Sequence, residues 1–90
     1  MEINQDKWSF SGDYTFNEIP IHIEQLNQTS IDNPIILDFT KLKNIDTSLL
    51  SFIFEIKRKA NLSNQSVKLS KIPKNLINLA SLYGVEKYLK

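Results

Sequence analysis

Ile35-Ile36-Leu37-Asp38-Phe39 is a short apolar run, and it decides the fold of the chain. The turn formers Asp32-Asn33-Pro34 precede it, and the polar stretch 40–46, which we expect to be a loop, follows. A short apolar run between such boundaries is typical of a strand that is buried on both faces of a sheet. The stretch therefore predicts a central strand, from which the rest of the chain can be placed.

The next segment, residues 46–61, carries the strongest helical pattern. Asp46 and Thr47 stand where a helix cap is expected, and Asn61 begins a group of polar residues that ends the helix. Apolar residues recur at helical spacing to form one stripe: Leu49, Ile53, Ile56 and Ala60. Phe52 lies at the edge of this stripe. The segment predicts a helix that packs on the sheet.

Residues 7–16 show the alternation of a half-buried hairpin. Trp8 and Phe10 alternate with polar residues, Ser11-Gly12-Asp13 reads as a turn, and Tyr14 and Phe16 resume the alternation. We expect Trp8, Phe10 and the later Phe39 in the core.

A first helix should follow this hairpin. Asn17 is a plausible N-cap, and Pro20 would fall in the first turn, where its missing N–H does no harm. Ile19, Ile23 and Leu26 lie on one helical face.

The last third of the chain predicts a strand and a helix. Val67-Lys68-Leu69 is a short strand, and a helix opens at Pro73. Gly84 is placed to cap the end of that helix, and residues 85–89 can add a last turn. The complete order is β-β-α-β-α-β-α. It predicts a single α/β domain over residues 1–90, with a four-stranded mixed sheet and helices mainly on one face.

Composition excludes several classes of function. A net charge of +1 argues against a nucleic-acid-binding surface, and the lack of cysteine excludes disulfides and thiolate sites. One histidine and two glycines leave no histidine metal cluster and no phosphate-binding glycine loop. No apolar run spans a membrane, and the N-terminus is not a secretory signal. We expect a cytoplasmic domain that is not an enzyme and needs no metal or cofactor.

The order of motifs resembles that of STAS domains, the sulfate-transporter and anti-sigma-antagonist family. The strand ending at Phe39, the Asp46-Thr47 pair at a helix start and the terminal Leu82-Tyr83-Gly84-Val85 carry the resemblance, which covers residues 8–89. The likeness is closest to the single-domain MlaB-type branch. One position departs from the pattern: the family commonly has glycine where this chain has Leu49.

The resemblance implies a partner-binding surface at the start of the second helix. Its residues here are Lys43, Asp46, Thr47, Ser48 and Phe52. Thr47 matches the phosphoacceptor of anti-sigma antagonists and a contact residue of the MlaB-type branch. Simpler interpretations stay open: Asp46 and Thr47 as a helix cap, Phe52 as a core-edge aromatic, and Lys43 in a solvated loop. His22 is expected to be a surface or satisfied core residue, and Tyr83 a core residue.

Two functions follow from the resemblance. The first is a non-catalytic subunit that binds and stabilises or regulates the ATPase of an ABC-type phospholipid transporter, which maintains outer-membrane lipid asymmetry. The alternative is an anti-sigma-factor antagonist that binds an anti-sigma kinase until Thr47 is phosphorylated. Neither function involves nucleic acid or direct insertion into a membrane. Leu49 and the Leu-Tyr-Gly-Val ending favour the first.

Overall fold

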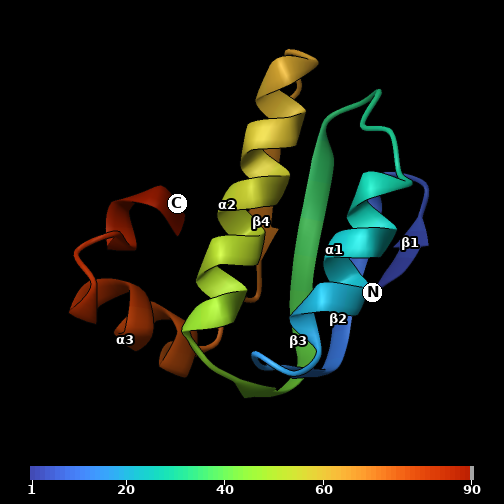
Figure 1. Ribbon diagram of the computed structural model, residues 1–90. Helices are drawn as coiled ribbons and strands as arrows, with labels where there is room; N and C mark the ends of the chain where they lie inside the picture. The colour runs from blue at the N-terminus through green and yellow to red at the C-terminus, as the bar shows by residue number, and fades with distance from the viewer. Residues whose placement is uncertain (90) are drawn as a thin grey trace.

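The computed structural model describes residues 1–89 and confirms an α/β fold. Its elements are β1 (Glu2–Asn4), β2 (Lys7–Tyr14), α1 (Ile19–Asn27), β3 (Ile35–Ile45), α2 (Thr47–Leu62), β4 (Val67–Ser70), α3 (Lys74–Leu82) and the 3-10 helix η1 (Glu86–Leu89). The sheet has the order β1-β2-β3-β4, in which β1 and β2 are antiparallel and the other two pairs are parallel. As expected, α1 and α2 cover one face, while α3 lies beside the start of α2 (Figure 1).

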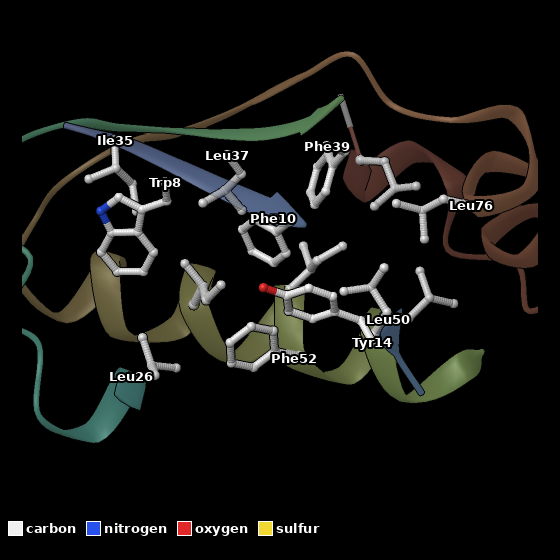
Figure 2. Packing of buried hydrophobic residues seen from close by; sticks show 14 of the residues in the cluster. Trp8, Phe10, Tyr14, Leu26, Ile35, Leu37, Phe39, Leu50, Phe52 and Leu76 are labelled. Carbon is white, nitrogen blue, oxygen red and sulfur yellow. The ribbon is translucent and has the colours of Figure 1, made fainter. Parts of the chain in front are cut away.

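The core lies between that face of the sheet and the two helices. Trp8, Phe10 and Phe39 are all at most 2% exposed, as the alternation predicts. Their rings meet side chains from α2 in one continuous cluster (Figure 2). Buried apolar area is the main stabilising contribution to a domain of this size.

The hairpin lies earlier in the chain than the sequence predicts. Ser11-Gly12-Asp13 is not a turn, because β2 runs through it to Tyr14 and only its register with β3 shifts there. Gly12 has a φ of 82°, so it accommodates this irregularity inside a strand. The real turn is Gln5-Asp6, where Gln5 has a φ of 57°. The strand pairing simply outweighs the local turn signal.

The central strand is also longer than predicted, and it is buried on one face rather than on both. The stretch 40–46 is not a loop, because β3 continues to Ile45, which pairs with Tyr14. Ile35, Leu37 and Phe39 point into the core, whereas Ile36 is 40% exposed on the other face. Polar neighbours such as Lys7 and Asp38 occupy that open face, which none of the helices within residues 1–89 covers (Figure 1).

The predicted cap of α1 is wrong, and a different signal starts this helix. The N-cap residue is Glu18 rather than Asn17. The Glu18 carboxylate accepts hydrogen bonds from the backbone N–H of Thr15, at 3.0 Å, and from the Thr15 hydroxyl. These bonds between Thr15 and Glu18 fix the turn before α1. Pro20 does fall in the first turn.

The end of the last α-helix is as predicted. Gly84, with a φ of 70°, follows the C-cap residue Tyr83 of α3, and its N–H bonds to the Ser81 carbonyl. The Val85 N–H bonds to the Ala80 carbonyl, which completes a Schellman motif. This turn directs the chain back toward α2, so that η1 and the buried Leu89 pack near it.

Candidate functional site at the start of helix α2

Asp46 is the N-cap of α2 and also ties two segments together. Its Oδ1 accepts the backbone N–H of Ser48 at 2.8 Å, which satisfies one of the free donors at the helix start. Its Oδ2 accepts the backbone N–H of Phe16 at 2.9 Å, so the loop before α1 is held against α2. The capping interpretation of Asp46 is thus confirmed.

These hydrogen bonds set the ionisation of Asp46. Partial burial acts to raise the pKa of its carboxyl, but the donors at Phe16 and Ser48 outweigh burial and hold the pKa below its ordinary value. The carboxylate is therefore ionised and fully engaged at neutral pH. A negative charge at this position also favours the helix dipole of α2.

Thr47 is the first residue of α2 and is exposed, whereas Ser48 is half-buried. Because Asp46 does the capping, the Thr47 hydroxyl is not needed for it. Thr47 therefore lies exposed at the positive end of the helix dipole.

A groove extends from Thr47 between α2 and the end of α3. One hollow of about 190 Å³ is lined by Thr47, Leu50, Ser51, Phe54, Tyr83 and Val85. An adjoining hollow of about 240 Å³ shares Phe54 and Val85 with the first and adds Tyr88. We call the two together the Thr47 groove. Its walls are apolar, and hydroxyl groups stand at its rim.

Exposed apolar side chains surround the groove. Tyr83 is 60% exposed and Tyr88 is 51% exposed, and the ring of Tyr88 packs edge-on against Phe54. Leu82 is 78% exposed beside another hollow that Ile45 and Leu79 also line. Clustered apolar exposure of this kind marks interaction surfaces more often than chance scatter does.

The structure divides the predicted site residues. Asp46, Thr47 and Ser48 are together at the start of α2. Lys43 is exposed near the end of β3, inside a strand rather than in the expected loop.

Phe52 does not belong to an exposed surface. It is 0% exposed, and its ring centroid lies 6.0 Å from that of Phe10 and 6.3 Å from that of Tyr14 (Figure 2). The prediction of a partly exposed anchor at Phe52 is therefore wrong. The helical stripe is wider than expected, because α1 and β2 both pack on that side of α2.

The groove also contains residues that were not predicted as part of a site. Ser51 and Phe54 follow Thr47 by four and seven residues, so helical spacing places them on one face and would have revealed them. Tyr83 was expected in the core, but it is exposed because it follows the last residue of α3, next to the glycine turn.

The single histidine has a structural role. The His22 ring stacks on the Tyr14 ring, with centroids 4.1 Å apart and an interplanar angle of 12°. Burial and the nearby N-terminal amine lower the pKa of His22, and Glu18 opposes them. His22 is thus a satisfied residue at the edge of the core, as expected.

Within residues 1–89, no group of three or more His, Cys, Asp or Glu side chains is arranged to hold a metal ion. In the same part of the chain, none of the helices has the length and apolar character needed to cross a membrane. The site is a surface of hydroxyl and apolar groups around one capped helix, which suits contact with another molecule.

Comparison with known families identifies the domain. The sequence matches the STAS domain model over residues 10–90. The chain belongs to the STAS domain family. No curated protein and no solved structure matches it. Membership supports a regulatory or binding role of the STAS domain in general, because the family consists mainly of non-enzymatic interaction domains.

Proposed function

We propose that this STAS domain is a non-catalytic subunit that binds the ATPase of an ABC-type phospholipid transporter, and stabilises or regulates it. The resemblance to the MlaB-type branch suggests this partner, a cytoplasmic location and a role in outer-membrane lipid asymmetry. The proposal rests on one observation: two motifs that are distant in the sequence lie side by side in the structure. Thr47 from the first motif and Tyr83 and Val85 from the second line the same hollow.

The chemistry of this surface suits a protein partner. Aromatic residues are enriched at the centres of protein interfaces, and Tyr83 and Tyr88 present large rings at a small entropic cost. The hydroxyl of Thr47 adds a polar contact that fixes orientation. Because the Asp46 cap and the Val85 turn hold the groove walls, the surface is preorganised for binding.

Co-purification tests this proposal. The STAS domain is co-expressed with the Mla-type ATPase subunit of the same organism, and the complex is analysed by native mass spectrometry. We expect a defined stoichiometric complex and a higher thermal stability of the ATPase than without the domain. Separate elution of the two proteins and an unchanged melting temperature of the ATPase would overturn the proposal.

One observation favours the alternative, an anti-sigma-factor antagonist. Thr47 is exposed at the first residue of α2, where a phosphate would gain from the helix dipole and would disrupt a packed interface. Against it, Leu49 is 0% exposed and fills the core at the position where the family commonly has glycine. Incubation with the anti-sigma kinase and ATP discriminates: a single added phosphate at Thr47 supports the alternative, and an unchanged mass argues against it.

A further inference from the structure

The near-zero net charge of the chain conceals a strong separation of charge. Residues 1–38 contain seven Asp and Glu but a single Lys, whereas residues 39–90 contain ten Lys and Arg but three Asp and Glu. The two parts therefore carry opposite net charges, acidic for the first and basic for the second. A net charge of +1 is the small difference between them.

The fold converts this sequence asymmetry into a spatial one. The sheet order β1-β2-β3-β4 follows the chain, so the acidic part with β1, β2 and α1 occupies one side of the domain. The basic part with α2, β4 and α3 occupies the other side (Figure 1). The Thr47 groove lies wholly within the basic side, because α2, the turn between α3 and η1, and η1 itself form it.

Two lysines flank the end of the groove at Tyr88. The Lys57 ammonium donates a hydrogen bond to the Tyr88 carbonyl oxygen, and Lys87 Nζ lies 5.2 Å from the centroid of the Tyr88 ring. Lys87 is exposed, and Lys57 is half-buried. Glu55, next to Phe54 in α2, is paired with Arg58, and Glu86 is the one acidic residue of η1. The two ammonium groups outnumber the Glu86 carboxylate, so a partner group entering the groove beside Phe54 meets an excess of positive charge at this end.

We propose that the Thr47 groove receives an acidic segment of the partner, which inserts one large apolar side chain between Phe54 and Tyr83. This inference rests on the proposed function and specifies which part of the ATPase docks. The apolar hollows supply the anchor site, and the lysines at Tyr88 supply the complementary charge. The groove continues the surface around Thr47, so the anchor and the Thr47 contact belong to one interface.

The apolar hollow and the flanking charges should contribute to binding in different ways, which mutations can separate. A steric block of the hollow should weaken binding at any salt concentration, because the anchor loses its place. Reversal of a flanking charge should weaken binding mainly at low salt, because exposed charges beyond about 8–10 Å are screened near physiological ionic strength. Electrostatic complementarity acts chiefly on the association rate, so the second effect should appear in that rate.

Isothermal titration of the purified ATPase subunit with the full-length domain tests the inference. Ser51→Trp fills the hollow from an exposed helix position, and Asn61→Trp places the same bulk on an exposed residue at the far end of α2. Lys87→Glu reverses a flanking charge, and Lys68→Glu makes the same change at the exposed residue of β4. Circular dichroism melts confirm that all four variants fold.

We expect Ser51→Trp to weaken binding at least tenfold, and Lys87→Glu to weaken it severalfold at low salt but not at high salt. The two control variants should bind like the wild type. If the wild type binds and Ser51→Trp and Lys87→Glu bind equally well, the groove is overturned while the proposed function stands. Both the groove inference and the proposed function fail if the wild type does not bind the ATPase. They also fail if the wild type associates with itself through this groove instead.

Discussion

Asp46 and Phe16 are joined by a hydrogen bond from the Phe16 backbone N–H to the Asp46 carboxylate, across thirty residues of sequence. The other oxygen of the same carboxylate caps α2. One side chain therefore fixes both the start of the helix that bears Thr47 and the neighbouring loop. The backbone of Phe16, whose side chain is exposed, is held next to the site in consequence.

Replacing Asp46 tests this double role. Asp46→Ala should lower the free energy of unfolding by about 1–2 kcal/mol, because it removes the cap and leaves the Phe16 N–H without its acceptor. Asp46→Asn should cost less, since an asparagine oxygen can still cap the helix. Urea unfolding followed by circular dichroism measures both values. An Asp46→Ala protein as stable as the wild type would contradict the assignment.

Replacing Tyr14 should not lower the free energy of unfolding, in contrast to replacing Asp46. Its hydroxyl is buried and has no hydrogen-bond partner of normal geometry, and burial raises its pKa to about 12 against a small opposing effect of the Ser11 backbone. Tyr14→Phe keeps the ring against Phe10 and His22 and removes an unsatisfied polar group. We expect unchanged stability or a gain of about 1 kcal/mol in urea unfolding. A loss above about 1 kcal/mol would show that the hydroxyl has a partner.

Much of the fold was predictable from the sequence because its signals are local. The stripe of α2, the Gly84 cap and the alternation around Trp8 each lie within one element, and all three are confirmed. The other features of the fold depend on pairing with strands that are distant in sequence. The Ser11-Gly12-Asp13 segment has the composition of a turn, yet it pairs with β3 and stays extended.

The site was predictable in part for a similar reason. Asp46 and Thr47 combine a capping signal with a family motif, and the structure places them together. The burial of Phe52 depends on α1 and β2, which are distant in sequence, and the helical pattern of α2 alone does not contain it. The exposure of Tyr83 likewise depends on where α3 ends.

The lowered pKa of Asp38 predicts that the free energy of unfolding decreases at acidic pH. Hydrogen bonds from the Thr40 hydroxyl and N–H, with a smaller contribution from Lys7, hold the pKa of Asp38 at about 2, against an ordinary 3.8. At pH values between about 2 and 3.8, the Asp38 carboxyl therefore binds more protons in the unfolded chain than in the folded one. This stabilisation is complete above about pH 4 and is lost as the pH falls toward 2.

Asp38→Asn should remove the stabilisation that this carboxylate provides. We expect that stabilisation to be about 1 kcal/mol at neutral pH, because solvent screens the charge of Asp38. Unfolding free energies measured from pH 7 to pH 2 should fall less steeply in this variant. Lys7→Met removes the ion pair but keeps both Thr40 hydrogen bonds, so most of the slope should remain. Identical slopes in the wild type and Asp38→Asn would contradict the assignment.

Two helix ends provide a matched pair of backbone tests. Gly84 after α3 and Asn64 after α2 take equivalent positions, with φ of 70° and 57°. A Cβ at Gly84 meets no atom within 4 Å, so Gly84→Ala should cost about 1 kcal/mol through backbone strain alone. Asn64→Gly relieves such strain and should stabilise the domain by about 0.5 kcal/mol. Thermal melts in which both variants shift in the same direction would refute this explanation.

The affinity of the Thr47→Glu variant for the ATPase subunit tests whether the start of α2 is the binding surface. A glutamate at the first residue of α2 favours the helix dipole, so the domain should stay folded while the contact surface gains a charge. Ser66→Glu adds the same charge to an exposed loop at the other end of α2 and serves as the control. We predict at least tenfold weaker binding for Thr47→Glu and unchanged binding for Ser66→Glu. Equal affinities of Thr47→Glu and the wild type would contradict the account.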